Sequence, residues 1–118
     1  MIDFFSLGRS SEKEAAKYLK KKGFKILRRN LVTPLGEIDL LAKADGCLVV
    51  IEVKGAGAES DVLPEARVGA KKRKKLKDLA RYLVATYRLE ETVVRFDVVG
   101  VTFIDGKATI RHYENAFE

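Results

Sequence analysis

The feature that most constrains the fold is a pair of apolar segments of similar length on either side of Asp45-Gly46. Residues 37–43 and 47–54 flank this dipeptide and are rich in β-branched and aliphatic side chains. An Asp-Gly pair between two such segments is a strong signal for a two-residue β-hairpin turn, because both central positions need a positive φ. The sequence therefore predicts antiparallel strands at 37–43 and 47–54, in a register that places Ala44 opposite Cys47.

This register brings four charged side chains to one face of the hairpin. Asp39 falls opposite Glu52, and Glu37 falls opposite Lys54. Residues two apart along a strand share a face, so all four side chains project to the same side. Opposed residues of an antiparallel pair have Cβ atoms about 5 Å apart, which brings the Asp39 and Glu52 carboxylates within reach of one ligand. A slip of one residue would separate them, so the prediction depends on the turn.

The apolar residues of the hairpin predict that this acidic pair is partly buried. They continue the acidic face and also fill the opposite one: Leu41, Leu48 and Val50 on the first, and Ile38, Leu40, Val49, Ile51 and Val53 on the second. A strand pair that is apolar on both faces is usually central in a sheet and covered on both sides. Opposed carboxylates in such a place must share a proton, pair with cations or bind a metal ion.

Two interpretations of the acidic pair follow. Mg²⁺ suits such a site, because it prefers oxygen ligands and needs only one or two protein carboxylates beside water and phosphate. Alternatively, Glu37 and Lys54 form an ion pair across the strands, and the four residues are a salt-bridge cluster. The hairpin alone supports both interpretations.

The residue inventory limits the chemistry that is open to the chain. It has one cysteine, Cys47, and one histidine, His112, so a thiolate zinc site is excluded and a serine–histidine triad is disfavoured. Catalysis would have to use carboxylates, lysine and a hard cation such as Mg²⁺ or Mn²⁺. No segment approaches the roughly 20 apolar residues of a membrane span, and no signal peptide is recognisable. We therefore expect no membrane partner and a cytoplasmic location.

The other sequence patterns predict a mixed α/β fold in a single domain of residues 1–118. Ser11 and Glu14 have the spacing of a capping box, and Gly23 marks the end of this first helix. A strand at 24–32 follows the helix and precedes the hairpin. A second helix begins around 64–70, and strands at 92–103 and 108–113 complete the chain. The order of helix, three strands, helix and two strands predicts a mixed sheet flanked by helices.

Glu12 is a candidate third acid near the hairpin. It lies one turn before Ala15 and Ala16 in the predicted first helix, at the open end of the apolar stripe that they form. This position would let its carboxylate reach the site of Asp39 and Glu52. The alternative is that Glu12 is a first-turn acid, which the helix dipole favours without any functional role.

Basic residues are concentrated in two runs, in a chain whose net charge is +6. Residues 17–29 contain seven basic residues and no acid, and six of the seven residues 71–77 are basic. The second run opens a predicted helix, where the dipole would favour acids instead. We expect it to bind phosphate groups, mainly through Lys71, Lys72, Arg73, Lys74 and Lys75. The alternative is a solvated helix face.

Several short motifs occur in an order that resembles the YraN family. They comprise Ala15-Ala16-Lys17-Tyr18-Leu19, Gly23-Phe24-Lys25-Ile26-Leu27, Glu37-Ile38-Asp39, Ile51-Glu52-Val53-Lys54, Arg95-Phe96-Asp97-Val98-Val99 and Glu114-Asn115-Ala116-Phe117. Each motif is short, but together they extend over nearly the whole chain. The YraN family consists of bacterial proteins predicted to belong to the PD-(D/E)XK superfamily of restriction-endonuclease-like nucleases, which is similar to Holliday-junction resolvases.

The resemblance implies a restriction-endonuclease-like mixed β-sheet flanked by helices and a metal-dependent endonuclease that acts on DNA, including branched or single-stranded DNA. It implies that Asp39 and Glu52 bind Mg²⁺ or Mn²⁺, with the carbonyl of Val53 as a further ligand. Lys54 would orient the attacking water or steady the phosphate, and Glu12 matches a family glutamate that precedes the Ala-Ala pair. A homodimer would suit a two-stranded substrate.

The chain departs from these patterns at two places. Gly55-Ala56-Gly57 stands where the family usually continues with a threonine and an arginine, which removes a phosphate contact. Ile38 stands where the wider superfamily has a proline before the aspartate. Two alternatives to a nuclease therefore stay open. One is a nucleic-acid-binding protein of nuclease-like fold that does not cut, and the other is an assembly protein whose basic faces contact an acidic partner.

Overall fold

The computed structural model describes residues 4–57, 65, 68–89 and 91–117. The elements in this part are α1 (Phe4–Lys21), β1 (Lys25–Thr33), β2 (Gly36–Ala44), β3 (Cys47–Gly57), α2 (Ala70–Thr86), β4 (Val93–Ile104) and β5 (Lys107–Phe117). The predicted order of helix, three strands, helix and two strands is confirmed. In this part of the chain, neither helix is long and apolar enough to cross a bilayer.

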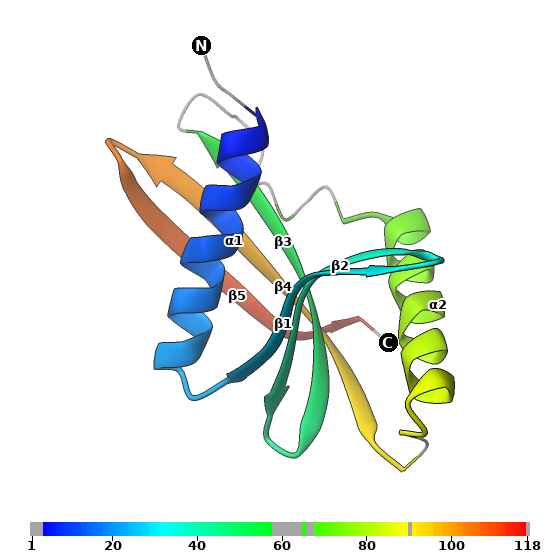
Figure 1. The fold of residues 1–118 in the computed structure, drawn as a ribbon. Coiled ribbons are helices and arrows are strands. Elements are labelled where there is room, and N and C mark those ends of the chain that lie inside the picture. Colours follow the sequence, from blue (N-terminus) through cyan, green and yellow to red (C-terminus); the bar gives the residue numbers. More distant parts are fainter. Residues whose placement is uncertain (1–3, 58–64, 66–67, 90, 118) are drawn as a thin grey trace.

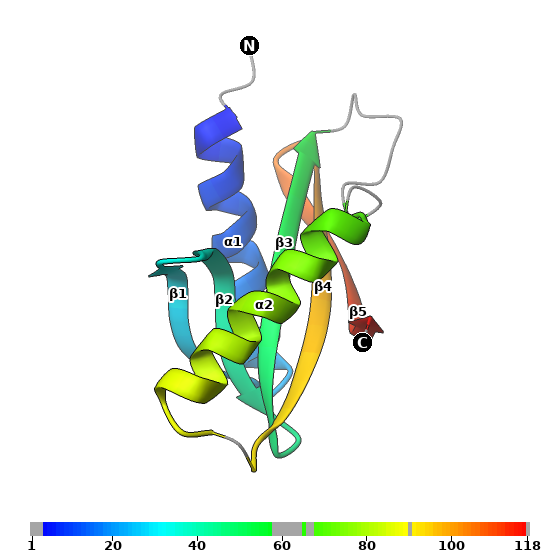
Figure 2. The same cartoon turned by 90° about the vertical axis from the view of Figure 1, so that its right-hand side faces the viewer.

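The five strands form one mixed sheet in the order β1-β2-β3-β4-β5. Short turns connect β1 to β2, β2 to β3 and β4 to β5, and these pairs are antiparallel. The connection from β3 to β4 contains α2, so these two strands are parallel. The two helices cover opposite faces of the sheet, as Figures 1 and 2 show.

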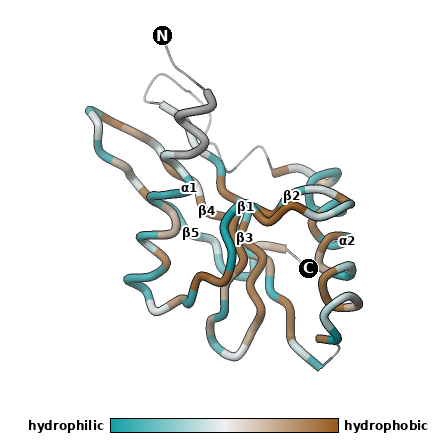
Figure 3. Tube along the Cα trace, in the orientation of Figure 1, coloured by the Kyte–Doolittle hydropathy of each residue, from teal (hydrophilic) through white to brown (hydrophobic). Residues whose placement is uncertain are grey.

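Each face of the sheet has its own hydrophobic core. On the α1 face, Ala15, Ala16 and Leu19 pack against Leu40, Val49, Ile51 and other strand residues. On the α2 face, Leu76, Leu79 and Leu83 pack against Leu41, Leu48, Val50 and Phe96. Figure 3 shows hydrophobic residues along the central strands. The prediction that the hairpin of 37–54 is covered on both sides is therefore confirmed.

The predicted register of the β2–β3 hairpin is confirmed over its first five pairs, from Ala44↔Cys47 to Leu40↔Ile51. The ladder ends there, one pair before Asp39 and Glu52. Ile38 packs on the α2 face, although its predicted neighbour Leu40 packs on the α1 face. Asn30 on the adjacent β1 has a φ of 50°, an uncommon value for a residue other than glycine. Both strands are therefore bent at this level, and the regular alternation of faces does not extend to Asp39.

Beyond this bend, the tip of the β1–β2 hairpin reaches α2 (Figure 1). A Cβ atom added to Gly36 at the tip would lie only 2.7 Å from Cε of Lys75 on α2, and Gly36 has a φ of 142°. The end of the flexible Lys75 side chain could move aside, but the positive φ would strain any side chain at this position. The backbone conformation of the turn thus requires the glycine.

The start of the first helix differs from the prediction. α1 begins at Phe4, so Ser11 lies in its third turn and Ser11 and Glu14 do not form a capping box. A serine three residues before a glutamate also occurs inside helices, so this spacing alone does not mark a helix start. The predicted end is confirmed, because α1 ends at Lys21 and Gly23 follows with a φ of 99°.

Two other boundaries differ. β3 continues to Gly57, three residues beyond its predicted end at Lys54, because Gly55, Ala56 and Gly57 pair with β4. β5 extends to Phe117, four residues beyond its predicted end. α2 begins at Ala70, within the predicted range of 64–70, of which residues 64, 66 and 67 lie outside the described residues.

A buried ion-pair network connects β4 to β5 and to Lys22, which directly follows α1. Asp97 is 0% exposed, and its two carboxylate oxygens accept hydrogen bonds from Nε and Nη2 of Arg95 at 2.9 and 3.0 Å. The backbone N–H of Asn115 donates to the same carboxylate at 3.0 Å, and Nε2 of His112 lies 2.8 Å from it. Nδ1 of His112 is 3.1 Å from the ammonium of Lys22, which can only donate. Nε2 of His112 therefore carries the hydrogen that is shared with Asp97.

We predict that Asp97→Ala lowers the free energy of unfolding by about 3–5 kcal/mol, because it leaves Arg95 without its buried partner. Urea denaturation followed by circular dichroism would measure the change. Lys74→Ala is the matched control, because its exposed pair with Asp78 contributes only about 0–1 kcal/mol. A loss below 1 kcal/mol for Asp97→Ala would contradict the role given to this network.

Candidate active site

Asp39 lies where β2 separates from β3. Its Oδ2 accepts a hydrogen bond from the backbone N–H of Val53 at 2.9 Å. The ladder between the two strands has already ended at this level, so the side chain satisfies a β3 donor that the β2 backbone does not reach. This bond fixes the Asp39 carboxylate beside residues 52–54 of β3.

Glu52 is buried on the α2 face of β3, with an exposed fraction of 3%. Two lysines approach its carboxylate from different elements. Nζ of Lys54, two residues along the same strand, is 3.7 Å from Oε1, and Nζ of Lys72, from the first turn of α2, is 3.5 Å from Oε2. Lys72 therefore belongs to the carboxylate site, and a negative partner at the start of α2 explains a cation that the helix dipole disfavours.

The electrostatics of Glu52 show how strongly the two acids interact. Burial and the nearby charge of Asp39 raise the pKa of Glu52 from 4.5 to about 7, although Lys72 and Lys54 act in the opposite direction. Oε2 of Glu52 accepts no hydrogen bond from the described residues. A buried carboxylate of this kind takes up a proton or a cation readily.

Glu12 lies close enough to Asp39 to respond to its charge. Burial, followed by the charge of Asp39, raises the pKa of Glu12, while a hydrogen bond involving Asn30 lowers it. Glu12 stands in the third turn of α1, so the interpretation as a first-turn acid is wrong. The charge of Asp39 thus acts on both Glu12 and Glu52.

The predicted ion pair of Glu37 and Lys54 is not formed among the described residues. Glu37 is exposed, and the carboxylate within ion-pair distance of Lys54 is Glu52. The bend at Asp39 carries Glu37 away from its predicted partner, because the ladder does not extend to that level. A salt-bridge cluster is still present, but its ion pairs join Lys54 and Lys72 to Glu52.

The residues present fit a hard divalent cation that has few protein ligands. Within the described part of the chain, no three side chains of histidine, cysteine, aspartate or glutamate are grouped so that they could hold a metal ion together. Glu12, Asp39 and Glu52 therefore do not form a three-carboxylate cage. Mg²⁺ needs only one or two carboxylates, and the unbonded Oε2 of Glu52 offers a ligand atom. Ligation by the Val53 carbonyl stays a prediction.

The predicted phosphate-binding run of α2 divides into two sets. Lys72 turns to Glu52, whereas Lys71, Arg73, Lys74 and Lys75 are exposed to solvent. The ammonium of Lys74 lies 3.3 Å from Asp78, which also accepts a hydrogen bond from Arg81. The exposed set thus carries positive charge on the same helix whose Lys72 contacts the buried Glu52.

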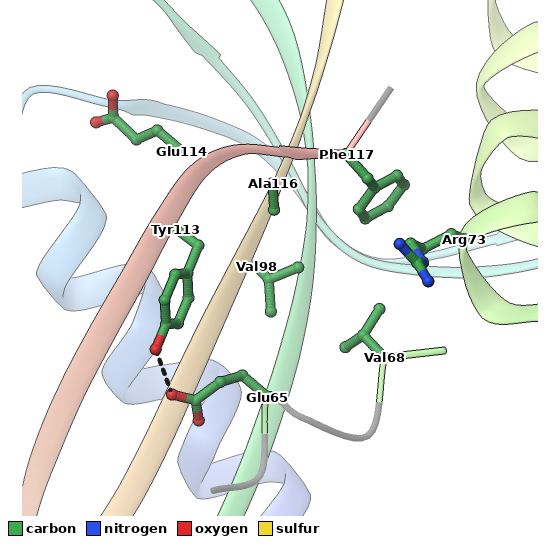
Figure 4. Close-up of a pocket in the computed structure, with 8 residues that line it drawn as sticks. All are labelled: Glu65, Val68, Arg73, Val98, Tyr113, Glu114, Ala116 and Phe117. Carbon is green, nitrogen blue, oxygen red and sulfur yellow. Dashed lines mark hydrogen bonds between the residues drawn. The ribbon is translucent and has the colours of Figure 1, made fainter. Parts of the chain in front are cut away.

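Sequence reasoning missed a second charged group next to this site. The guanidinium of Arg111 on β5 donates to both carboxylate oxygens of Glu65, and the hydroxyl of Tyr113 donates to Glu65 at 3.0 Å, as Figure 4 shows for Tyr113. Burial alone would raise the pKa of Glu65, but these bonds hold it below its usual value. Gly100 makes room, because a Cβ atom there would lie 2.0 Å from Oε1 of Glu65. A glycine inside a predicted strand was the available signal for such a close approach.

Sequence comparisons agree with the resemblance to the YraN family. The profile of the uncharacterised protein family UPF0102, the YraN family, matches residues 11–101. The UPF0102 protein THEYE_A1950 of Thermodesulfovibrio yellowstonii is 45% identical over 111 residues, which cover 94% of this chain and 95% of that protein. A UPF0102 protein of Syntrophotalea carbinolica is 39% identical over 113 residues, which cover 96% of this chain and 92% of that protein.

We predict that the metal-free protein becomes less stable as the pH rises from about 5 to about 8. The pKa of Glu52 is about 7 in the folded state and 4.5 ordinarily, so the folded protein holds a proton that the unfolded chain has already lost. The associated loss is of the order of 2 kcal/mol, and Glu52→Gln should remove it. Chemical denaturation in EDTA at several pH values would measure this. If the free energy of unfolding of Glu52→Gln fell with pH as steeply as that of the unmodified protein, Glu52 would not be the cause of the pH dependence.

Proposed function

We propose that this chain, which belongs to the uncharacterised protein family UPF0102, hydrolyses phosphodiester bonds in DNA with the help of Mg²⁺ or Mn²⁺. The observation that carries the proposal is the pair of the half-buried Asp39 and the buried Glu52. The two acids interact strongly, and one oxygen of Glu52 has no hydrogen bond from the described residues. Two lysines lie within 3.7 Å of the same carboxylate. Carboxylates and lysines in this arrangement suit a phosphate and a hard cation together.

Asp39 and Glu52 would hold the divalent cation, which supplies the Lewis acidity that activates a water and polarises the phosphate. The hydrogen bond from Val53 keeps the Asp39 carboxylate in place. Lys54 and Lys72 contact Glu52 only at 3.7 and 3.5 Å, so their ammonium groups can turn to a phosphate without breaking a short bond. There they would offset the negative charge that develops during hydrolysis. Glu12 would act on the side of Asp39, through a water.

The exposed cations at the start of α2 support DNA as the substrate. Lys71, Arg73, Lys74 and Lys75 would contact backbone phosphates, which gives affinity without sequence readout and makes binding sensitive to salt. The cytoplasm, where DNA and Mg²⁺ occur together, is the location that fits this activity. A homodimer would bring two such sites to the two strands of one substrate.

A binding protein that does not cut is the second candidate. Lys54 and Lys72 already neutralise much of the acidic charge at Glu52, so the cluster can be stable without a metal ion. In that case DNA affinity would depend on the α2 cations and would not change on substitution of Asp39 or Glu52.

We predict that Asp39→Asn and Glu52→Gln each reduce Mg²⁺- or Mn²⁺-dependent cleavage of labelled DNA by about 100-fold or more, because each removes a negative ligand while it keeps the side-chain shape. Duplex, flap, junction and single-stranded substrates would be compared by gel electrophoresis. Asp105→Asn in the exposed β4–β5 turn is the control, since asparagine tolerates its φ of 50°.

Two results would contradict the proposal. One is wild-type cleavage by both site variants. The other is the absence of metal-dependent cleavage by the unmodified protein on every substrate, with DNA binding intact, which would favour the binding protein.

A further inference from the structure

A groove lies directly beside the carboxylate site, between α2 and β5. It consists of two adjoining cavities of about 650 and about 750 Å³ that share Arg73, Ala116 and Phe117. Val98 and Tyr113 also line the first cavity, and Lys74, Lys77 and Arg81 line the second. We call this feature the α2–β5 groove. Figure 4 shows the first cavity, with Arg73 facing the ring of Phe117.

The sheet register makes the groove continuous with the site. Glu52 on β3 pairs with Val98 on β4, and Val98 pairs with Tyr113 on β5. Partners on neighbouring strands project to the same face, so these three residues form one row that runs from the carboxylate into the groove. On the helix, Lys72 contacts Glu52 and the next residue, Arg73, lines the groove. A chain of phosphates could therefore pass from one to the other without leaving the surface.

The charges of the groove favour a polyanion. The second cavity is lined by four cations and by no acid among the described residues, and two of the cations, Lys74 and Arg81, share the exposed Asp78 as a partner outside the lining. Two acids line the first cavity, but Glu65 is bound by Arg111 and Glu114 is paired with Lys22. Within the described part of the chain, no carboxylate lies within ion-pair distance of Arg73 or Lys77. Arg73, Lys77 and Arg81 follow one another at intervals of four residues, which places them about 6 Å apart along one side of α2.

Two aromatic rings accompany these cations. Phe117 stacks on Phe96 with ring centroids 5.0 Å apart, which holds its orientation, and Tyr113 is 43% exposed. Cations that follow a backbone and aromatic rings that stack with bases are the combination that binds single strands. A duplex keeps its bases stacked inside, so it cannot stack with these rings and is not held along the cations of the groove.

We propose that the α2–β5 groove binds a single-stranded segment of nucleic acid that adjoins the strand at the carboxylate site. The inference deepens the proposed function, because it gives the substrate a single-stranded arm. Arg73, Lys77 and Arg81 contact the phosphates, and Tyr113 and Phe117 stack with bases.

Fluorescence anisotropy of the metal-free protein with labelled oligo(dT) and with a duplex of equal length tests this binding. Lys77→Ala/Arg81→Ala removes two groove cations, and Lys71→Ala/Lys75→Ala removes two cations of the same helix outside the groove. We expect the groove variant to weaken oligo(dT) binding about tenfold and duplex binding less than threefold. The control pair should weaken oligo(dT) binding less than the groove pair. Tyr113→Leu, which keeps an apolar side chain, should weaken oligo(dT) binding about fivefold or more and leave duplex binding unchanged.

Equal effects of the two double variants on oligo(dT) would overturn the inference, as would equal effects of the groove variant on both nucleic acids. Failure of the proposed nuclease is distinguishable from these results. If no substrate is cleaved but oligo(dT) binding depends on the groove, the groove assignment holds and only the catalytic proposal fails. If cleavage requires Asp39 but the groove variant binds oligo(dT) normally, the catalytic proposal holds and only the groove assignment fails.

Discussion

The hydrogen bond between the Asp39 carboxylate and the backbone N–H of Val53 is the interaction on which the candidate site depends. It occurs where β2 and β3 separate, and it satisfies a donor that the ladder leaves open. The same bond holds one carboxylate against another, Glu52, which the α2 core shields from water. The separation of the strands therefore leaves room for a ligand, and it brings together two carboxylates that a cation would stabilise.

α2 connects this site to the rest of the molecular surface. Its apolar residues pack on the sheet. The basic residues around them project in different directions. Lys72 faces Glu52, Lys75 meets the tip of the β1–β2 hairpin, and Arg73 enters the α2–β5 groove. Residues of one basic run thus contact the Glu52 carboxylate, lie beside the hairpin tip and line the groove. Charge balance at Glu52 explains why the helix begins with cations against the preference of its dipole.

Much of this arrangement could be predicted from local sequence patterns. Asp45-Gly46 predicted the hairpin register because the turn chemistry is local, and the apolar faces predicted coverage on both sides. The bend at Asp39 could not be predicted, because the local pattern shows neither that the ladder ends one pair before Asp39 nor that the hairpin tip lies beside α2, a helix distant in sequence. The partnership of Lys72 with Glu52, and of Glu65 with Arg111, depends on the same long-range packing. The helix start at Ser11 was wrong, because a capping-box spacing alone does not show that a helix begins there.

A titration of Mn²⁺ by calorimetry, with the unmodified protein and with Asp39→Asn, tests the central claim that Asp39 and Glu52 form a divalent-cation site. Each protein would be titrated alone and with a short DNA duplex. The account predicts that one ion binds to the unmodified protein and that binding is lost in Asp39→Asn. Equal binding by both proteins, or no binding by the unmodified protein even with DNA, would contradict it and leave the two acids as a charge cluster balanced by Lys54 and Lys72.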